Sequence, residues 1–250
     1  MKFIYITATG IRHTAFIRYM QNIAPPCLII REPKVIHNSK KKSKKIIAYN
    51  QLLQEYEKLY FDSSEKLYTS NIVSTDPGQV NNEKYIRTIR EAQPDIILVF
   101  GASLLSRDIL QIPKLFSLNI HTGITQLFRG VDSYFWAIHD QKPEGIGATI
   151  HIIDNGIDTG NIVLQGRPEL SICDDLPDLF FKSVNTGFRL LKESIEKFYS
   201  NRMKSYQLTK RGKLYQMKDF NESTFQIAQK SLKSVLREFL KENSSHSWTT

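Results

Sequence analysis

The sequence predicts an α/β fold with a mostly parallel sheet and helices on both faces, and its first segments show why. Residues Phe3 to Ala8 are apolar without alternating, as in a strand that is buried on both faces. From Ile11 to Ile23 apolar residues recur at helical spacing, and Pro25-Pro26 ends that helix. Cys27 to Arg31 then resumes a strand. Strand, helix and strand at this spacing form a βαβ unit, which requires a parallel sheet.

Predicted helices and strands continue to alternate as far as residue 200. We expect further strands at Ile96–Phe100, in the segment that ends at His121, at Gly145–Ile153 and at Asn161–Gly166. We expect further helices in the later part of 34–60 and at Asn81–Glu91, Leu104–Leu110 and Leu176–Phe198. The strands at Gly145–Ile153 and Asn161–Gly166 are expected to pair as a hairpin.

The composition of the chain changes after Asn201, which predicts a main domain of residues 1–200 and a C-terminal extension of 201–250. Residues 206–208 and 213–217 flank Arg211-Gly212 and predict a small hairpin. An apolar stripe from Phe225 to Leu240 predicts an amphipathic helix. We expect this helix to dock on the main domain, and a homodimer contact through the C-terminal region is the alternative. Residues 244–250 form a polar tail.

The chain has 250 residues, a mass of 28.9 kDa and a formal net charge of +9, which favours an acidic partner such as a phosphate-bearing ligand or nucleic acid. The lysines are spread along the sequence, so the net charge alone does not locate a binding site. The one dense run is Lys40–Lys45, for which we favour a solvated loop over contact with RNA or another anion.

Two isolated cysteines, Cys27 and Cys173, show no spacing typical of a metal site and fit a reducing compartment. The longest apolar run, Ile96–Phe100, is far too short to cross a membrane. The first residues lack the apolar region and cleavage site of a signal peptide. We therefore expect a cytoplasmic protein without a membrane partner.

The candidate site begins at Asn119-Ile120-His121, where a predicted strand ends. Side chains alternate along a strand, so Asn119 and His121 point the same way, about 6.5–7 Å apart, while Ile120 packs inward. A carboxamide and an imidazole placed in this way can hold a developing oxyanion and handle a proton, as acyl transfer requires. Asp158, in the loop from Asp154 to Gly160, is a candidate carboxylate to orient the histidine.

Each of these residues also has an ordinary structural interpretation. A single strand histidine is most often a polar or core residue, and Asp, Asn and Gly are turn-formers. Calcium is disfavoured because the loop does not match an EF-hand, and His121, His139 and His151 match no zinc spacing, so we predict no metal. The segment Thr7–His13 has one glycine and matches neither a P-loop nor a dinucleotide fingerprint.

Four separate motifs, taken together, identify a family. They are Ser117-Leu118-Asn119-Ile120-His121, Phe128-Arg129-Gly130, Gly147-Ala148-Thr149-Ile150-His151 and 154–162, Asp-Asn-Gly-Ile-Asp-Thr-Gly-Asn-Ile. In order and spacing they resemble the folate-dependent formyltransferases, a family that includes glycinamide ribonucleotide, methionyl-tRNA and sugar-nucleotide N-formyltransferases. The resemblance covers residues 94–166 well and implies a Rossmann-like catalytic domain that uses N10-formyltetrahydrofolate as formyl donor.

The resemblance also assigns roles to residues. It places the catalytic Asn, His and Asp of the family on Asn119, His121 and Asp158, with His121 acting either as a general base or as a charged stabiliser of the oxyanion. The folate is expected against two segments: Phe100, Gly101, Ser103, Leu104 and Leu105, and Ile153, Asp154, Asn155, Gly156 and Ile157. The expected contacts with the acceptor are Thr122, Gly123 and Arg129, where a structural role of Arg129 in its loop is equally open.

The departures from the family bear on the acceptor. After His121 the family has a Pro-Ser-Leu-Leu-Pro stretch, whereas residues 122–127 read Thr-Gly-Ile-Thr-Gln-Leu, without either proline. About fifty residues follow Asn201, and they show no pattern of the C-terminal barrel of the tRNA enzymes, so we expect nucleic acid to be disfavoured. We favour a nucleotide-linked amino sugar of polysaccharide synthesis. The alternatives are glycinamide ribonucleotide or methionyl-tRNA formylation, a catalytically idle folate- or nucleotide-binding relative, and a nucleic-acid-binding module.

Overall fold

The structure, a computed structural model, describes residues 1–33, 43–61 and 71–245. Half of the predicted lysine-rich loop, Lys40–Lys42, and the last part of the predicted polar tail, residues 246–250, lie outside this described part of the chain. Lys44 and Lys45, which were also predicted to lie in the loop, instead begin a helix.

In the ranges that the structure describes, seven strands form one sheet in the order β3-β2-β1-β4-β5-β7-β8. The strands are β1 (Phe3–Ala8), β2 (Pro26–Glu32), β3 (Ile72–Ser74), β4 (Ile96–Phe100), β5 (Phe116–His121), β7 (Ala148–Ile152) and β8 (Ile162–Gly166). The first five run parallel, and β7 and β8 run antiparallel. The prediction of a mostly parallel sheet with a terminal hairpin is therefore confirmed.

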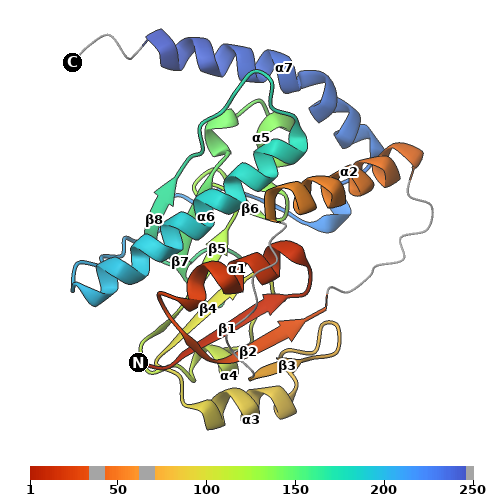
Figure 1. The fold of residues 1–250 in the computed structure, drawn as a ribbon. Helices are drawn as coiled ribbons and strands as arrows, with labels where there is room; N and C mark the ends of the chain where they lie inside the picture. Colours follow the sequence, from red (N-terminus) through yellow and green to blue (C-terminus); the bar gives the residue numbers. More distant parts are fainter. Residues whose placement is uncertain (34–42, 62–70, 246–250) are drawn as a thin grey trace.

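Helices cover both faces of this sheet, as the sequence predicts (Figure 1). They are α1 (Ile11–Gln21), α2 (Lys44–Phe61), α3 (Glu83–Ala92), α4 (Arg107–Leu110), α5 (Ser133–His139), α6 (Leu176–Tyr199) and α7 (Glu222–Ser245), with short 3-10 turns at η1 (Pro143–Gly145) and η2 (Met217–Asp219). Along β1, Phe3 and Tyr5 pack with α1 and α6, whereas Ile4 and Ile6 pack with α3. A strand that is apolar on both faces needs this double cover.

The direction of strand order reverses between β1 and β4, which lie side by side in the centre of the sheet. The chain progresses outward through β2 and β3 on one side and through β5 on the other. In an open α/β sheet such a reversal leaves a crevice beyond the carboxyl ends of the strands, where ligands bind. The loops after β1, β4 and β5 all begin at this edge.

The predicted C-terminal hairpin is wrong. Tyr206 bridges to Ile162, and β9 (Lys213–Tyr215) runs parallel to β6 (Phe128–Gly130) in a second, two-stranded sheet. The two halves of the expected hairpin thus pair with strands of the main domain. The edges of those strands present unpaired backbone groups, whereas an isolated two-stranded hairpin is only marginally stable.

The amphipathic helix predicted for the extension is α7, and it docks on the main domain as expected. Its buried residues Phe225, Leu232 and Leu236 share one apolar core with α5 and with β9. The described part of the extension, residues 201–245, therefore packs against the rest of the chain, and a separate C-terminal domain of residues 201–250 stays a prediction.

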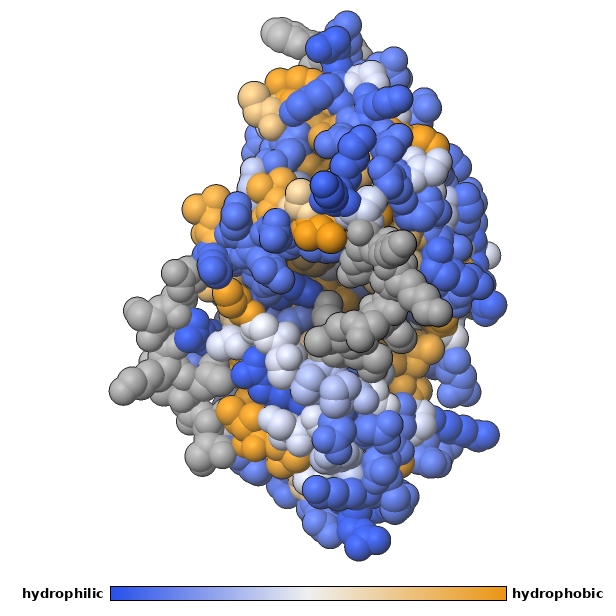
Figure 2. Space-filling model, turned by 90° about the vertical axis from the view of Figure 1, so that its right-hand side faces the viewer, coloured by the Kyte–Doolittle hydropathy of each residue, from blue (hydrophilic) through white to orange (hydrophobic). Residues whose placement is uncertain are grey.

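The surface of the molecule is mostly hydrophilic on the face shown in Figure 2, where apolar patches are separated by polar side chains. In the described ranges, none of the helices combines the length and the apolar character that a membrane span requires.

Candidate active site

Strand β5 carries Asn119 and His121 to the carboxyl edge of the sheet. Ile120, between them, is buried under α6, where a side-chain atom at Gly187 would collide with it. Asn119 and His121 therefore leave the opposite face of β5, as the alternation predicts. In the sheet Asn119 pairs with His151 of β7, which brings a second histidine to the same place.

The loop between β7 and β8 folds back over this edge and presents Asp158. Asp154 Oδ1 accepts hydrogen bonds from Gly156 N at 3.0 Å and from Thr159 Oγ1 at 2.6 Å, as turn-forming residues do. Asp158 itself adopts a left-handed conformation with φ of 51°. A Cβ at Gly160 would lie 1.7 Å from Ile152 O, so only glycine allows this close return to β7. The loop is a tight turn and also the support of Asp158.

Asp158 and His121 form a buried ion pair. Their Oδ2 and Nδ1 atoms lie 3.1 Å apart, and the side chains are 11% and 5% exposed. Burial by itself favours the neutral form of each group. The opposite charge of the partner and the hydrogen bonds outweigh it, so the pKa of His121 is raised and the pKa of Asp158 lies well below its usual range. The sequence predicted that these two residues lie close together, and the structure places them in contact.

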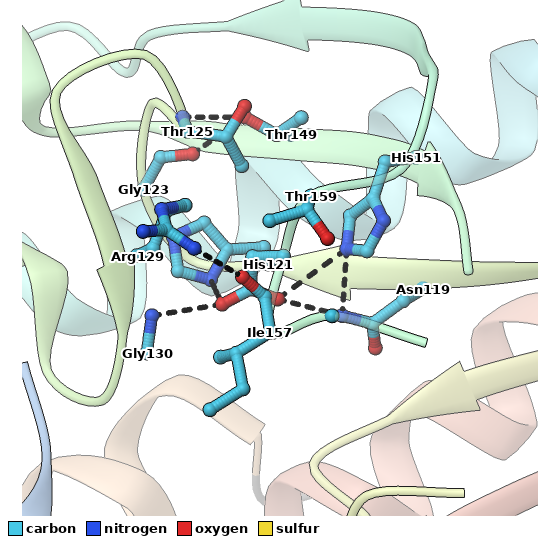
Figure 3. A network of polar contacts seen from close by, with 12 residues as sticks. Asn119, His121, Gly123, Thr125, Arg129, Gly130, Thr149, His151, Ile157 and Thr159 are labelled. Carbon is cyan, nitrogen blue, oxygen red and sulfur yellow. Dashed lines mark hydrogen bonds and ion pairs between the residues drawn. The ribbon is translucent and has the colours of Figure 1, made fainter. Parts of the chain in front are cut away.

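His151 is the member of this cluster that the sequence analysis missed. Its Nε2 lies 3.1 Å from Asn119 Nδ2 and 3.4 Å from Asp158 Oδ1, and its side chain is buried (Figure 3). Asn119 Nδ2 also lies 3.5 Å from Asp158 Oδ1. The sequence signal was the histidine that ends the Gly147–His151 motif. That this histidine lies beside Asn119 follows from the pairing of β7 with β5, which the sequence spacing does not define.

The hydrogen-bond partners of both histidines indicate where their protons lie. His151 Nδ1 is 3.1 Å from Ile152 O, and a carbonyl oxygen only accepts, so Nδ1 carries a proton, while Nε2 faces the Asn119 carboxamide nitrogen at 3.1 Å. His121 Nε2 is 3.1 Å from Phe128 O, while Nδ1 faces Asp158. Both nitrogens of His121 thus face acceptors, which is the environment of an imidazolium ion.

Arg129 and Gly130, on β6, tie the Asp158 loop to the rest of the molecule. Arg129 Nη1 donates to Ile157 O and its Nε to Gly212 O, both at 2.9 Å. The backbone N–H of Gly130 donates to Asp158 Oδ2 at 2.8 Å. The structural role that the sequence left open for Arg129 is therefore present, since its guanidinium fixes two backbone segments.

The loop of residues 122–127 lacks the family prolines and is held by side-chain amides and hydroxyls instead. Gln126 and Gln165 exchange hydrogen bonds at 2.9 and 2.6 Å, and Gln165 Nε2 also reaches Thr149 Oγ1 at 2.8 Å. Thr149 Oγ1 in turn donates to Gly123 O at 2.7 Å. Gly123 is buried so close to Ser133 and His121 that a Cβ there would collide with both. Of the predicted acceptor contacts in this loop, Thr122 is half-buried and Gly123 is a packing position.

The residues expected against the folate lie in two segments at the same edge. Phe100 is buried in the core, while Gly101, Ser103 and Leu104 are exposed and Leu105 is half-buried. In the second segment Asp154, Asn155 and Gly156 are exposed, and Ile153 and Ile157 are half-buried. The structure thus places both groups at accessible loops beyond β4 and β7, the position in which ligands bind to such sheets.

Glu32 is a second buried carboxylate at this edge, and the sequence analysis missed it. It ends β2 and is 3% exposed. Its Oε1 accepts from Val80 N at 3.0 Å and its Oε2 from Ser103 N at 2.9 Å. Glu32 therefore holds the backbone of the loop after β4. A glutamate that follows an apolar strand gives no sequence signal for this role.

Comparison with known proteins places this site in a family. A family model described as "Formyl transferase" matches residues 17–191. The methionyl-tRNA formyltransferase of Clostridioides difficile (strain 630) is 32% identical over 128 residues, which are 50% of this chain and 41% of that protein. The matches to the first three such relatives thus span about two fifths of the relatives' own length.

Solved structures agree in fold. A sugar N-formyltransferase from Shewanella sp. FDAARGOS_354 superimposes with a TM-score of 0.61 and 16% identity, covering 92% of this chain and 87% of that one. An N-formyltransferase from Helicobacter canadensis, in complex with folinic acid and dTDP-3-aminofucose, gives 0.58 and 20%, covering 93% and 81%. Since the family model covers well over half of the sequence, the chain belongs to the formyl transferase family.

Proposed function

We propose that this protein transfers a formyl group from N10-formyltetrahydrofolate to a primary amine. The observation that carries the proposal is the buried cluster in which Asp158 contacts both His121 and His151, with the Asn119 carboxamide beside it. This cluster lies at the carboxyl edge of the sheet in a member of the formyl transferase family. It supplies fixed hydrogen-bond donors and charge where a tetrahedral intermediate needs them.

The reaction itself needs no outside acid or base in its balance. A neutral amine attacks the formyl carbon, the carbonyl oxygen becomes negative, and a tetrahedral intermediate forms. The bond between the formyl carbon and N10 of the donor then breaks, N10 gains a proton, and the former amine loses one. The products are tetrahydrofolate and an N-formyl acceptor. What the protein contributes is positioning of the two substrates and stabilisation of the negative oxygen.

Asn119 and His121 have distinct roles in this scheme. Asn119 donates a hydrogen bond to the oxyanion, and His151 holds its carboxamide nitrogen in place by accepting a hydrogen bond from it. His121 acts as an imidazolium whose charge stabilises the oxyanion. This choice over a general base is supported by the contacts of both ring nitrogens, which face the Asp158 carboxylate and the Phe128 carbonyl and leave no lone pair for an incoming proton.

For the acceptor we propose a nucleotide-linked amino sugar, and with it a cytoplasmic role in polysaccharide synthesis. A structural neighbour described as a sugar N-formyltransferase and an N-formyltransferase solved with dTDP-3-aminofucose support this acceptor class, as does the net charge of +9. Methionyl-tRNA is the second candidate, because several of the relatives matched by sequence are described as methionyl-tRNA formyltransferases.

A turnover assay tests the proposal. Purified protein is incubated with N10-formyltetrahydrofolate and, separately, with dTDP-linked 3-amino and 4-amino dideoxy sugars, glycinamide ribonucleotide and methionyl-tRNA. We expect tetrahydrofolate release and a formylated product with an amino-sugar acceptor, and loss of both in Asn119→Ala. Formylation of methionyl-tRNA alone would replace the acceptor proposal. No folate turnover with any acceptor would refute the enzymatic function and favour the idle folate-binding relative.

A further inference from the structure

A pocket of about 630 Å³ opens beside the Asp158 loop, on the side that faces the C-terminal segment. Arg129, Ile157, Arg211 and Leu214 are among its lining residues, together with Asp154 of the loop. Two arginines from segments far apart in the sequence therefore line one pocket that also borders the Asp158 loop.

Arg211 reaches this pocket because the backbone beside it is docked on the main domain. Gly212 N donates to Thr125 O and Lys213 N to Leu127 O, both at 2.9 Å, before β9 continues along β6. A Cβ at Gly212 would lie 2.3 Å from the carbonyl carbon of Leu127, so the chain passes where only glycine fits. This docking places Arg211 next to Arg129, whose Nε donates to Gly212 O.

The charges of the pocket are unbalanced. Within the described part of the chain, neither Arg129 nor Arg211 forms an ion pair with a carboxylate, and Arg129 donates its hydrogen bonds to two neutral carbonyl groups. The nearby carboxylate of Asp158 is paired with His121. Asp154, the acidic residue of the pocket, has its Oδ1 occupied by Gly156 and Thr159. Asp154 still carries one negative charge, so the three charged groups of the lining leave one excess positive charge for an anion, the group that arginine binds best.

We propose that Arg129 and Arg211 form a subsite for an oxyanionic group of a substrate, with Arg211 supplied by the C-terminal segment. The proposal rests on the formyl-transfer function and specifies how a charged reactant is held. Two sources present such a group: the diphosphate of a nucleotide-linked acceptor and the glutamate carboxylates of the folate donor. The side chains of Ile157 and Leu214, the latter 37% exposed, give the pocket an apolar wall beside its two cations.

Direct binding to the full chain tests this subsite without relying on turnover. Inorganic pyrophosphate and p-aminobenzoylglutamate serve as probes of the two sources, and calorimetric titration measures their affinities. We expect wild-type protein to bind one probe, Arg211→Ala to bind it roughly tenfold more weakly, and Arg211→Lys to fall between them. Arg237→Ala is the matched control, because it removes an equal charge from an exposed position on α7 that does not line this pocket.

The outcomes separate the two sources. Weakening of pyrophosphate binding, with a raised KM for the acceptor and an unchanged KM for the donor, assigns the subsite to the acceptor phosphate. Weakening of p-aminobenzoylglutamate binding, with a raised KM for the donor, assigns it to the glutamate carboxylates. If neither probe binds wild-type protein, or if Arg211→Ala behaves as Arg237→Ala does, the subsite is refuted. Because the titration needs neither an acceptor nor turnover, it tests the subsite even if the protein transfers no formyl group.

Discussion

Two carboxylates at the same edge of the sheet, Asp158 and Glu32, are shielded from water and stabilised by different partners. Asp158 lies between two histidine rings, at 3.1 Å from His121 Nδ1 and 3.4 Å from His151 Nε2. Glu32 accepts hydrogen bonds from two backbone N–H groups, those of Val80 and Ser103. Both carboxylates avoid the cost of an uncompensated buried charge.

Under the proposed function, a carboxylate serves chemistry in one region and geometry in the other. A titratable partner such as His121 can change its charge, and a carboxylate beside it controls the pKa of that partner. A peptide N–H has no accessible charge state, so the contacts of Glu32 fix the position of a loop and nothing else. Loss of Asp158 should therefore act on the rate of the reaction, and loss of Glu32 on binding and stability.

Asp158→Asn should give the largest effect. The amide keeps the shape of the side chain but removes the charge that raises the pKa of His121, so His121 becomes neutral near pH 7. We expect kcat to fall by about 10³-fold or more, by analogy with the loss of the carboxylate from a catalytic triad. The measurement is kcat for formyl transfer together with an NMR titration of His121. An unchanged histidine pKa would show that Asp158 does not control it.

Asn119→Ala should follow, because it removes one donor to the oxyanion. A single donor of this kind contributes about 2.7–4 kcal/mol to the lowering of the barrier, so we expect kcat to fall by roughly 10²–10³-fold with little change in either KM. Asn243→Ala, which removes an exposed asparagine of α7, is the matched control. Equal rates for the two variants would exclude Asn119 from the reaction.

His151→Ala tests whether this histidine acts through Asn119. It leaves the carboxamide with only the longer, 3.5 Å contact to Asp158 Oδ1, and by analogy with residues that orient metal ligands the expected contribution is about 10–100-fold. We expect kcat to fall within that range and the double variant His151→Ala/Asn119→Ala to be no slower than Asn119→Ala alone. Additive losses would show that His151 has a role independent of Asn119.

Glu32→Ala and Glu32→Gln test the other carboxylate. Alanine leaves the N–H groups of Val80 and Ser103 without their acceptor, and each unsatisfied group costs about 1–3 kcal/mol of unfolding free energy. We expect a lower free energy of unfolding in urea and a several-fold higher KM for the folate donor, with kcat nearly retained. Glutamine keeps one acceptor oxygen and should be intermediate. A drop in kcat without a change in KM would contradict a role confined to geometry.

The pH dependence of stability gives the smallest and most specific difference. The pKa of His121 is raised in the folded protein, so its contribution is complete below its unfolded value of about 6.5 and is lost as the pH rises through the folded value. The lowered pKa of Asp158 gives a contribution that is present above about 3.9 and is lost as the pH falls. The free energy of unfolding of the wild type should therefore exceed that of Asp158→Asn most between about pH 3.9 and pH 6.5.

Urea unfolding of both proteins from pH 4 to 9 measures this difference. We expect the gap in unfolding free energy to narrow toward the alkaline end, and the corresponding Glu32→Gln series to show no such narrowing above pH 6.5, because peptide N–H groups do not titrate there. A constant gap between wild type and Asp158→Asn across that range would contradict a raised histidine pKa.

The sequence identified one of the two carboxylate regions and missed the other. Asn119, His121 and Asp158 were predicted to converge, because their residue types and strand positions are typical of acyl-transfer chemistry. Their roles in catalysis stay a prediction that the variants above test. Glu32 carried no such signal, since its role arises from the loops of residues 76–80 and 101–105, which only the folded chain brings to it.

The C-terminal segment shows the same limit. Its apolar stripe correctly predicted α7, but residues 206–215 pair with β8 and β6 and not with one another. Local pattern defines which segments are extended, whereas strand partners depend on which edges the rest of the fold leaves open.

The sequence alone thus determined the succession of strands and helices, the buried faces and the reactive residue types, because side-chain period and polarity act over short distances along the chain. Only the tertiary structure decided that β7 lies beside β5, which brings His151 to Asn119, and that β9 lies beside β6, which brings Arg211 to Arg129. These strand pairings depend on contacts between segments distant in sequence, and the local sequence pattern does not specify them.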